Sequence, residues 1–364
     1  MNNSIRCRKI LFVSGYLARN GTEAFMMNVF RNIDRSRFHI DFLIFSREDI
    51  VYEDEIKHSG SSVFVLPMRK DGFTYYKSLN SFFKKNQYDV IHWCTCSCTT
   101  VAPLFFSYCH HVPVRVTHSH NSNCIGLHNK ILHFIQRPLM NLLTTDRLAC
   151  SDKASKWLFG KRDSVIVKNG IDIKKFSYNT KVREKIRREF DISDTTSVIG
   201  HVGRFDPVKN HSFIIDIFAR YAECHDSVLL LIGIGALEKQ IRNKVKSLHL
   251  ESKVVFLYER SDVPDLLQAM DLFIMPSLFE GLPFVLVEAQ AAGLPCLVSE
   301  NVDPHIKITP HLSFMSLNQS NDEWAKMINI ILEKYKRVNL DYYIKKSGFD
   351  IDSTVRRLEY IYNK

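Results

Sequence analysis

The 364-residue sequence predicts an α/β protein with two parallel-sheet domains and a C-terminal amphipathic helix. Two observations support this fold class. Short apolar runs alternate with amphipathic stretches, which is typical of strand–helix repeats, and this alternation restarts after about residue 175. Hydrophobic residues make up 45% and charged residues 24% of the chain, as in soluble globular proteins. The length allows two domains that each bury a core.

The first half reads as a doubly wound α/β domain. The expected strands are residues 9–14, 40–45, 62–66, 90–93, 114–117 and 147–150. The expected helices are residues 22–32, 74–85, 99–109 and 129–143. Asn169-Gly170 ends this half with a turn, because Asn-Gly favours positive φ.

The second half repeats the pattern. After a charged helix at 181–190, strands are expected at 197–202, 228–232, 254–257, 272–275 and 296–299, with helices between them. We therefore expect one domain at residues 1–175 and another at 176–364, which includes a terminal helix at 349–362. Ligands bind at the carboxyl ends of parallel strands. Each Rossmann-like domain is therefore expected to bind its ligand at the carboxyl edge of its sheet.

Cysteine usage and the N-terminus indicate a cytoplasmic protein. The nine cysteines are an odd number and no export signal precedes them, so reduced thiols are expected. No apolar run approaches the roughly 18 residues that span a bilayer. The spacing of Cys94, Cys96 and Cys98 is not that of a zinc site, and Asp350 and Asp352 suit a helix N-cap better than a metal. No metal or cofactor is expected.

The positive charge is concentrated in the first half. Residues 1–175 carry a net charge of +11, whereas residues 176–364 carry −1. Such a half favours an anionic partner, namely nucleic acid, an anionic membrane face or a phosphorylated substrate. No nucleic-acid motif is present. For any single basic residue, a solvated surface position remains the alternative.

A loop and a helix after strand 272–275 carry two carboxylates. Glu280 lies in the loop at the strand's carboxyl end, and Glu288 lies about one turn into the following helix. The first turn of a helix leaves backbone N–H groups free, which attract phosphate. Glu288 could accept hydrogen bonds from ribose while Glu280 reaches a sugar; a solvated helix face is the alternative. The expected nucleotide-binding residues of the turn and first helical turn are Gly281, Leu282, Pro283, Phe284 and Val285.

A second loop supplies cations. Strand 197–202 leads into Gly203-Arg204, and Lys209 follows five residues later. Gly203 permits close backbone approach, and the planar Arg204 guanidinium suits diphosphate oxygens. Cations placed there would stabilise the negative charge that develops on a departing diphosphate. From spacing alone, both could also be surface charges.

The Glu280/Glu288 segment, continuing to Ala292-Gly293-Leu294-Pro295, and Gly203-Arg204 with Lys209 together resemble the donor-site signatures of the family 4 retaining glycosyltransferases of the GT-B fold. The resemblance implies that the two Rossmann-like domains face each other across a cleft, and that the first domain binds the acceptor and the second the nucleotide-sugar donor. It implies retaining transfer from a UDP-sugar to a hydroxyl of a lipid-linked or oligosaccharide acceptor. Arg204 and Lys209 would hold the diphosphate.

Three further positions follow from this resemblance. Arg260 matches the arginine that helps to hold the base, but Tyr258 stands near where relatives have a small residue, often Gly. Tyr258 would either stack on the base or pack in its loop. Asn20-Gly21 stands where relatives usually show two glycines. Gly21 would let the first loop approach the diphosphate or the acceptor, or would simply make the loop flexible.

The string His118-Ser119-His120-Asn121 follows strand 114–117 and matches bacterial exopolysaccharide and capsule members of the family. A histidine at a strand's carboxyl end could contact a sugar hydroxyl or the reacting centre. We expect His118 rather than His120 to do so, although most histidines are structural.

Other activities and a location are also considered. A non-catalytic GT-B subunit and a sugar-nucleotide epimerase share the expected fold, whereas a phosphorylase would need a recognisable pyridoxal lysine. The basic first domain is expected to contact anionic lipid at the inner face of the cell membrane. Lys130 and Arg137, which flank an apolar helix, are candidate contacts.

Overall fold

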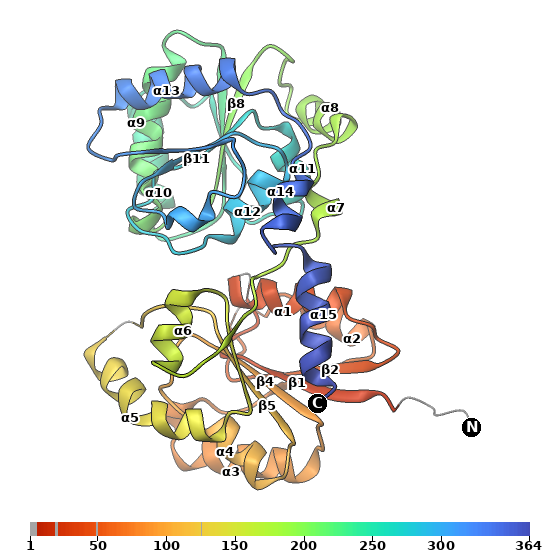
Figure 1. Ribbon diagram of the computed structural model, residues 1–364. Helices are drawn as coiled ribbons and strands as arrows, with labels where there is room; N and C mark the ends of the chain where they lie inside the picture. Colours follow the sequence, from red (N-terminus) through yellow and green to blue (C-terminus); the bar gives the residue numbers. More distant parts are fainter. Residues whose placement is uncertain (1–5, 19–20, 49, 125) are drawn as a thin grey trace. The chain divides into compact units, whose positions relative to one another are not determined.

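The computed structural model describes residues 6–18, 21–48, 50–124 and 126–364. The chain forms two compact units (Figure 1). The first contains the described residues up to Gly170 together with Ile351–Lys364, and the second is Ile171–Asp350. No helix in the described ranges is long and apolar enough to cross a membrane.

The first unit is built on a parallel sheet of seven described strands in the order β3-β2-β1-β4-β5-β6-β7. Its strands are β1 (Arg8–Val13), β2 (Phe38–Ile44), β3 (Val63–Val65), β4 (Val90–Thr95), β5 (Val114–Ser119), β6 (Asp146–Ala149) and β7 (Val165–Ile166). Its helices before Gly170 are α1 (Gly21–Asn32), α2 (Glu53–His58), α3 (Phe73–Lys85), α4 (Ala102–Cys109), α5 (Leu127–Leu143) and α6 (Asp152–Phe159), with a 3-10 turn at Arg69–Asp71.

Alternation along β1 divides the core of this unit into two layers. Ile10 and Phe12 pack with α1 and α2 on one face, whereas Leu11 and Val13 pack with α3 to α6 on the other. Successive side chains of a strand point to opposite faces. Both faces are therefore covered, which explains the nearly continuous apolar strands.

The second unit contains a parallel sheet of six described strands in the order β10-β9-β8-β11-β12-β13. Its strands are β8 (Ser197–Val202), β9 (Ser227–Ile232), β10 (Val254–Phe256), β11 (Leu272–Met275), β12 (Cys296–Ser299) and β13 (Leu312–Met315). Its helices are α7 (Ile173–Phe176), α8 (Thr180–Glu189), α9 (His211–Ala222), α10 (Glu238–Ser247), α11 (Val263–Ala269), α12 (Phe284–Ala291), α13 (Asn321–Lys334) and α14 (Asp341–Lys346), with 3-10 turns at Pro207–Lys209 and Pro304–Ile306. The predicted pair of parallel-sheet α/β domains is confirmed.

The terminal helix α15 (Ile351–Tyr362) belongs to the first unit, and its expected place in the C-terminal domain was wrong. It packs beside α1 (Figure 1), and its apolar stripe, which includes Val355 and Leu358, is buried in the first unit's core. The Tyr362 hydroxyl hydrogen-bonds His92 Nδ1 on β4 at 2.5 Å. An amphipathic helix packs its apolar stripe against an apolar surface of the fold, and that surface need not belong to the domain that precedes the helix in sequence.

Candidate active site

The candidate site lies at the switch point of the second sheet. Strands β8 and β11 are neighbours, and the chain leaves in opposite directions on either side of them. Ligands bind outside the carboxyl ends of strands at such a point. The loops that follow are residues 203–210 and 276–283. They are joined by hydrogen bonds from the Leu278 amide to the Val208 carbonyl (2.8 Å) and from Asn210 Nδ2 to the Pro276 carbonyl (3.2 Å).

The two loops bring Lys209 and Glu280 together. Lys209 Nζ donates a hydrogen bond to Glu280 Oε1, and the two side chains are 18% and 16% exposed. The Lys209 amide donates to Asp206 Oδ1 at 3.1 Å, which caps the short turn. The Glu280 carbonyl accepts from the Asp303 amide at 3.1 Å. Both charges are thus fixed by their loops, and a ligand would meet a preformed ion pair.

Arg204 is the exposed cation of the site. Its guanidinium makes no hydrogen bond or ion pair with any residue that the structure describes. The loop that carries it packs closely against the loop after β9: a Cβ on Gly233 would lie 2.2 Å from the Gly203 carbonyl oxygen. A Cβ on Gly235 would lie 2.5 Å from the Phe205 carbonyl oxygen. Close packing of the loops after β8 and β9 therefore explains the Gly233-Ile234-Gly235 sequence.

Helix α12 holds the second carboxylate. The helix is largely buried, and buried Gln290 fixes it by donating to the Leu286 and Ile306 carbonyls at 3.0 and 2.9 Å. Glu288 is half-buried and forms no hydrogen bond with the described residues. Burial raises the pKa of Glu288 to about 7, and Lys175 opposes this rise. A desolvated carboxyl without a partner is a ready acceptor for ligand hydroxyls.

The turn before α12 lies where the sequence predicted it. Gly281 is exposed, whereas Leu282, Phe284 and Val285 are partly buried against the core. Pro283 is the residue before the helix, and its carbonyl accepts from the Leu286 amide at 3.1 Å. The first amides of a helix have no intrahelical acceptor. This turn can therefore present backbone donors to an anion.

Arg260 and Tyr258 follow β10. The Arg260 guanidinium binds Asp262 through two hydrogen bonds of 2.8 and 2.6 Å, so its cation is already paired. Tyr258 has φ of +41° and a ring that is 58% exposed, with the Arg242 guanidinium 5.2 Å from its centroid. A positive φ is easiest for glycine. This backbone explains the small residue expected near this position.

In the first unit, the structure does not support the preference for His118 over His120. His118 is fully buried within β5, with its Nδ1 3.1 Å from His92 Nε2 and its ring edge-on to Phe25 at a centroid distance of 4.8 Å. The strand continues to Ser119, so His118 is a core residue. His120 follows the strand end and is half-buried. Burial holds the pKa of both histidines well below the usual range.

The sequence analysis missed Glu23 near the first sheet's switch point. Glu23 lies in the first turn of α1 and is 5% exposed, with its Oε1 accepting from Ser14 Oγ at 3.1 Å. The Glu23 carboxylate adds to desolvation in raising the pKa of Cys96, which follows β4. The sequence could have indicated Glu23, because it is a carboxylate in the first turn of the helix that follows the first strand. Gly21 begins α1 and is exposed, whereas Asn20 lies outside the described residues.

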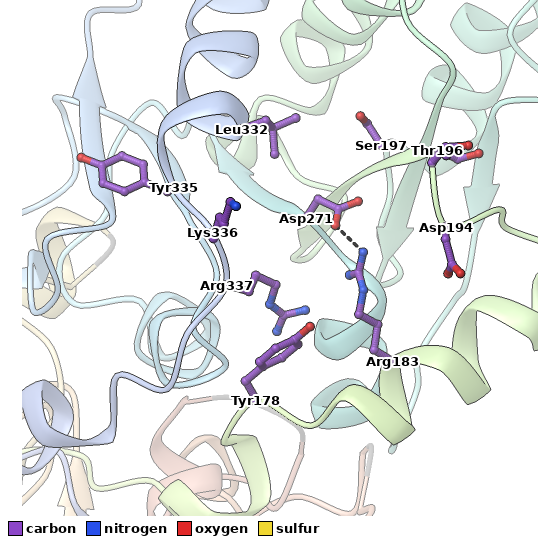
Figure 2. Close-up of a pocket in the computed structure, with 11 residues that line it drawn as sticks. Tyr178, Arg183, Asp194, Thr196, Ser197, Asp271, Leu332, Tyr335, Lys336 and Arg337 are labelled. Carbon is purple, nitrogen blue, oxygen red and sulfur yellow. Dashed lines mark hydrogen bonds and ion pairs between the residues drawn. The ribbon is translucent and has the colours of Figure 1, made fainter.

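A cavity of about 360 Å³ lies at the opposite, amino edge of the second sheet, where Ser197 begins β8 (Figure 2). Its arginines are occupied by protein groups. Arg183 binds Asp271 at 2.6 Å, and both Arg183 and Arg337 donate to the Met270 carbonyl just after α11, at 3.0 and 2.9 Å. Cations at a helix C-terminus stabilise it. The arginines of this cavity therefore stabilise the end of α11. The cavity is separate from the loops of the candidate site.

No group of three or more His, Cys, Asp or Glu side chains in the described residues is arranged to hold a metal ion.

Known proteins share both the sequence and the fold. The protein named "Putative glycosyltransferase EpsF" of Bacillus subtilis (strain 168) is 31% identical over 378 residues, covering 100% of this chain and 98% of EpsF. The UDP-Gal:alpha-D-GlcNAc-diphosphoundecaprenol alpha-1,3-galactosyltransferase of Escherichia coli is 28% identical over 234 residues, covering 61% of this chain and 60% of that enzyme. The crystal structure of Anabaena HepE in complex with UDP and glucose matches with a TM-score of 0.77 at 20% identity, covering 98% of this chain and 100% of HepE.

The sequence model of the family described as "Glycosyl transferases group 1" matches residues 182–347, which include both loops of the candidate site. EpsF extends the match over the whole chain, and the HepE structure shares the two-domain GT-B fold. The protein is therefore a member of the group 1 glycosyltransferases, as the sequence motifs predicted.

Proposed function

We propose that the protein is a retaining glycosyltransferase that uses a UDP-sugar, with a hexose or N-acetylhexosamine as the transferred group. The acceptor is a hydroxyl of a lipid-linked or oligosaccharide intermediate of a surface polysaccharide. The main support is that the Lys209–Glu280 ion pair and the unpaired Arg204 lie on two loops that hydrogen bonds join. The UDP and glucose in HepE and the diphosphoundecaprenol acceptor of the E. coli relative support this choice.

The donor's diphosphate would lie against Arg204 and Lys209, with the first turn of α12 supplying backbone donors. Glu280, which neutralises Lys209 in the free protein, would orient the sugar, while Glu288 accepts ribose hydroxyls. The acceptor oxygen bonds to the anomeric carbon as the bond to the diphosphate breaks. The acceptor's proton passes to the leaving phosphate on the same face. Preorganised cations stabilise the charge that develops there, so this site is proposed to work without a metal ion.

In the first unit, Gly21 and His120 are the proposed acceptor-side residues, because they follow strands that flank or adjoin that sheet's switch point. We place the protein in the cytoplasm, with the basic first unit in peripheral contact with the anionic inner face of the membrane. The net charge of +11 on residues 1–175 supports this location.

The test is transfer from a panel of UDP-hexoses and UDP-N-acetylhexosamines to a polyprenyl-diphosphate-linked sugar, followed by UDP release and by NMR of the new anomeric linkage. Glu280→Gln should abolish most transfer, while Glu251→Gln, at an exposed carboxylate, should not. Donor epimerisation without transfer would favour the epimerase. UDP binding without turnover on any acceptor would favour the non-catalytic subunit.

A further inference from the structure

Helix α5 of the first unit carries an exposed apolar stripe. Its members are spaced mainly at four residues, which places them on one side of a helix. They are Leu127 (75% exposed), Ile131 (50%), Phe134 (52%), Ile135 (68%), Leu139 (42%) and Leu142 (79%). Large exposed apolar patches on a folded protein mark interaction sites.

The other side of α5 is fixed, so the helix cannot roll to hide this stripe. His133 is buried with its ring stacked on Trp157 at 4.1 Å, and its Nδ1 accepts from the Cys98 amide at 3.0 Å. Gln136 Nε2 donates to the Thr99 carbonyl at 2.9 Å. Met140 is fully buried in the core. The packing of the opposite side of α5 therefore keeps the stripe exposed in the folded unit.

The apolar surface extends to neighbouring helices. α4 packs against α5, and α3 packs against α4, so the three helices cover one face of the sheet (Figure 1). On α4, Phe105 and Tyr108 are exposed, and at the start of α3, Phe73 is 80% exposed. The helices next to α5 thus also carry exposed aromatic side chains.

The charge around this face is mainly positive. Residues 69–146, which include α3, α4 and α5, contain eight Lys and Arg and three acidic residues, Asp71, Asp89 and Asp146. Asp89 precedes β4, and its carboxylate accepts from the Lys9 amide at 2.9 Å. None of the three helices contains an acidic side chain. On α5 itself, Lys130 and Arg137 lie along one edge of the stripe, with the Arg137 guanidinium 5.0 Å from the Phe134 ring centroid.

We infer that the α5 stripe inserts into the headgroup and acyl boundary of an anionic lipid bilayer. An amphipathic helix with apolar residues on one face and flanking cations suits this position. A second copy of the chain is a poorer occupant, because a two-fold contact places the same surface on both sides and would bring like charges together. The inference rests on the proposed lipid-linked acceptor and identifies the surface that would bring the enzyme to it.

The test uses the full-length protein and vesicle sedimentation. Vesicles of phosphatidylglycerol mixed with phosphatidylcholine should bind the protein, and phosphatidylcholine alone should bind it less. Ile131→Ser with Ile135→Ser should lower partitioning to the mixed vesicles by roughly ten-fold or more, since burial of each aliphatic side chain contributes strongly. High salt should weaken but not abolish wild-type binding, because only the ionic part is screened.

Ile330→Ser is the matched control, since Ile330 is 52% exposed on α13 of the second unit. The control should bind vesicles like the wild type. Wild-type-like binding by the α5 variant, or no wild-type binding to anionic vesicles, overturns the inference. A solution dimer that the α5 variant disperses, without vesicle binding, assigns the face to a second copy instead.

Transfer to a water-soluble oligosaccharide acceptor separates this inference from the proposed function. The α5 variant should keep its UDP affinity and its rate on that acceptor. Loss of vesicle binding with retained soluble transfer supports the α5 surface. Intact stripe-dependent vesicle binding without transfer on any acceptor would overturn the proposed function while leaving the membrane surface standing.

Discussion

Replacement of Glu288 by glutamine should stabilise the ligand-free protein while weakening nucleotide binding. The carboxyl is half-buried on an otherwise apolar helix and has no hydrogen-bond partner among the described residues. Its pKa rises from 4.5 to about 7 because burial disfavours the charged form. Glu288→Gln keeps the shape of the side chain and removes that charge.

The sign and size follow from proton linkage. Between pH 4.5 and about 7, the folded protein binds the Glu288 proton more tightly than the unfolded chain, so stability falls as pH rises. The full shift corresponds to about 3 kcal/mol, and partial exposure of the side chain reduces this to about 1–2 kcal/mol. The variant should therefore unfold roughly 2–8 °C above the wild type at pH 8. Below pH 4.5 the two should converge.

Calorimetric unfolding at pH 8 and pH 4.5 measures this difference, and titration with UDP at pH 8 measures the ligand effect. Loss of charge-assisted hydrogen bonds to the ribose should weaken UDP binding by about 10- to 100-fold. A variant less stable than the wild type at pH 8, or a difference that does not change with pH, would refute the desolvation argument. Unchanged UDP affinity would refute the ribose role.

Other perturbations test separate parts of the structure. Arg204→Ala should lower turnover about 10²- to 10³-fold without changing the unfolding temperature, because the side chain is exposed and unpaired; a near-normal rate would contradict its role. Transfer should persist in EDTA because Arg204 and Lys209 supply the positive charge, and loss that Mn²⁺ or Mg²⁺ restores would show a missed metal site. Tyr258→Gly should raise the free energy of unfolding in urea by about 1 kcal/mol, because glycine adopts the positive φ without strain. It should leave UDP affinity unchanged. Ten-fold weaker UDP binding would instead indicate that the Tyr258 ring stacks on the base. Leu358→Ala should destabilise the first unit by about 2–5 kcal/mol in calorimetry, and selective loss of hydrogen-exchange protection in the second unit would contradict the position of α15.

Strands buried on both faces were predicted best from the sequence. Three predicted strands, at 197–202, 272–275 and 296–299, match β8, β11 and β12 to the residue, because continuous apolar runs bounded by polar residues or turns mark such strands. Strand β7 has only two residues, too few for a pattern. The capping box of Ser320 and Glu323 could have marked the start of α13.

The end of the strand before the histidines was misplaced by two residues, and the preference for His118 depended on that end. The prediction ended the strand at Thr117, which put His118 in the loop, whereas β5 runs to Ser119. Inside a central strand covered on both faces, side chains are mostly buried whichever way they point, and β5 buries every residue except Arg115. His120 is the first histidine beyond the strand end, which is why it is the one proposed for the acceptor side. Boundary errors of this size are harmless for a fold but decide which residue can meet a ligand.

The pairing of Lys209 with Glu280 could not be read from the sequence, because each residue was assigned from its own motif. The two meet because β8 and β11 are neighbours in the sheet although 71 residues separate the pair. In the free protein Glu280 neutralises Lys209, so Arg204 is left as the exposed, unpaired cation of these loops. The diphosphate is therefore expected to meet Arg204 first and then share Lys209 with Glu280. Glu280 is the carboxylate proposed to orient the sugar. Binding of the diphosphate at Lys209 would therefore also affect where this carboxylate lies.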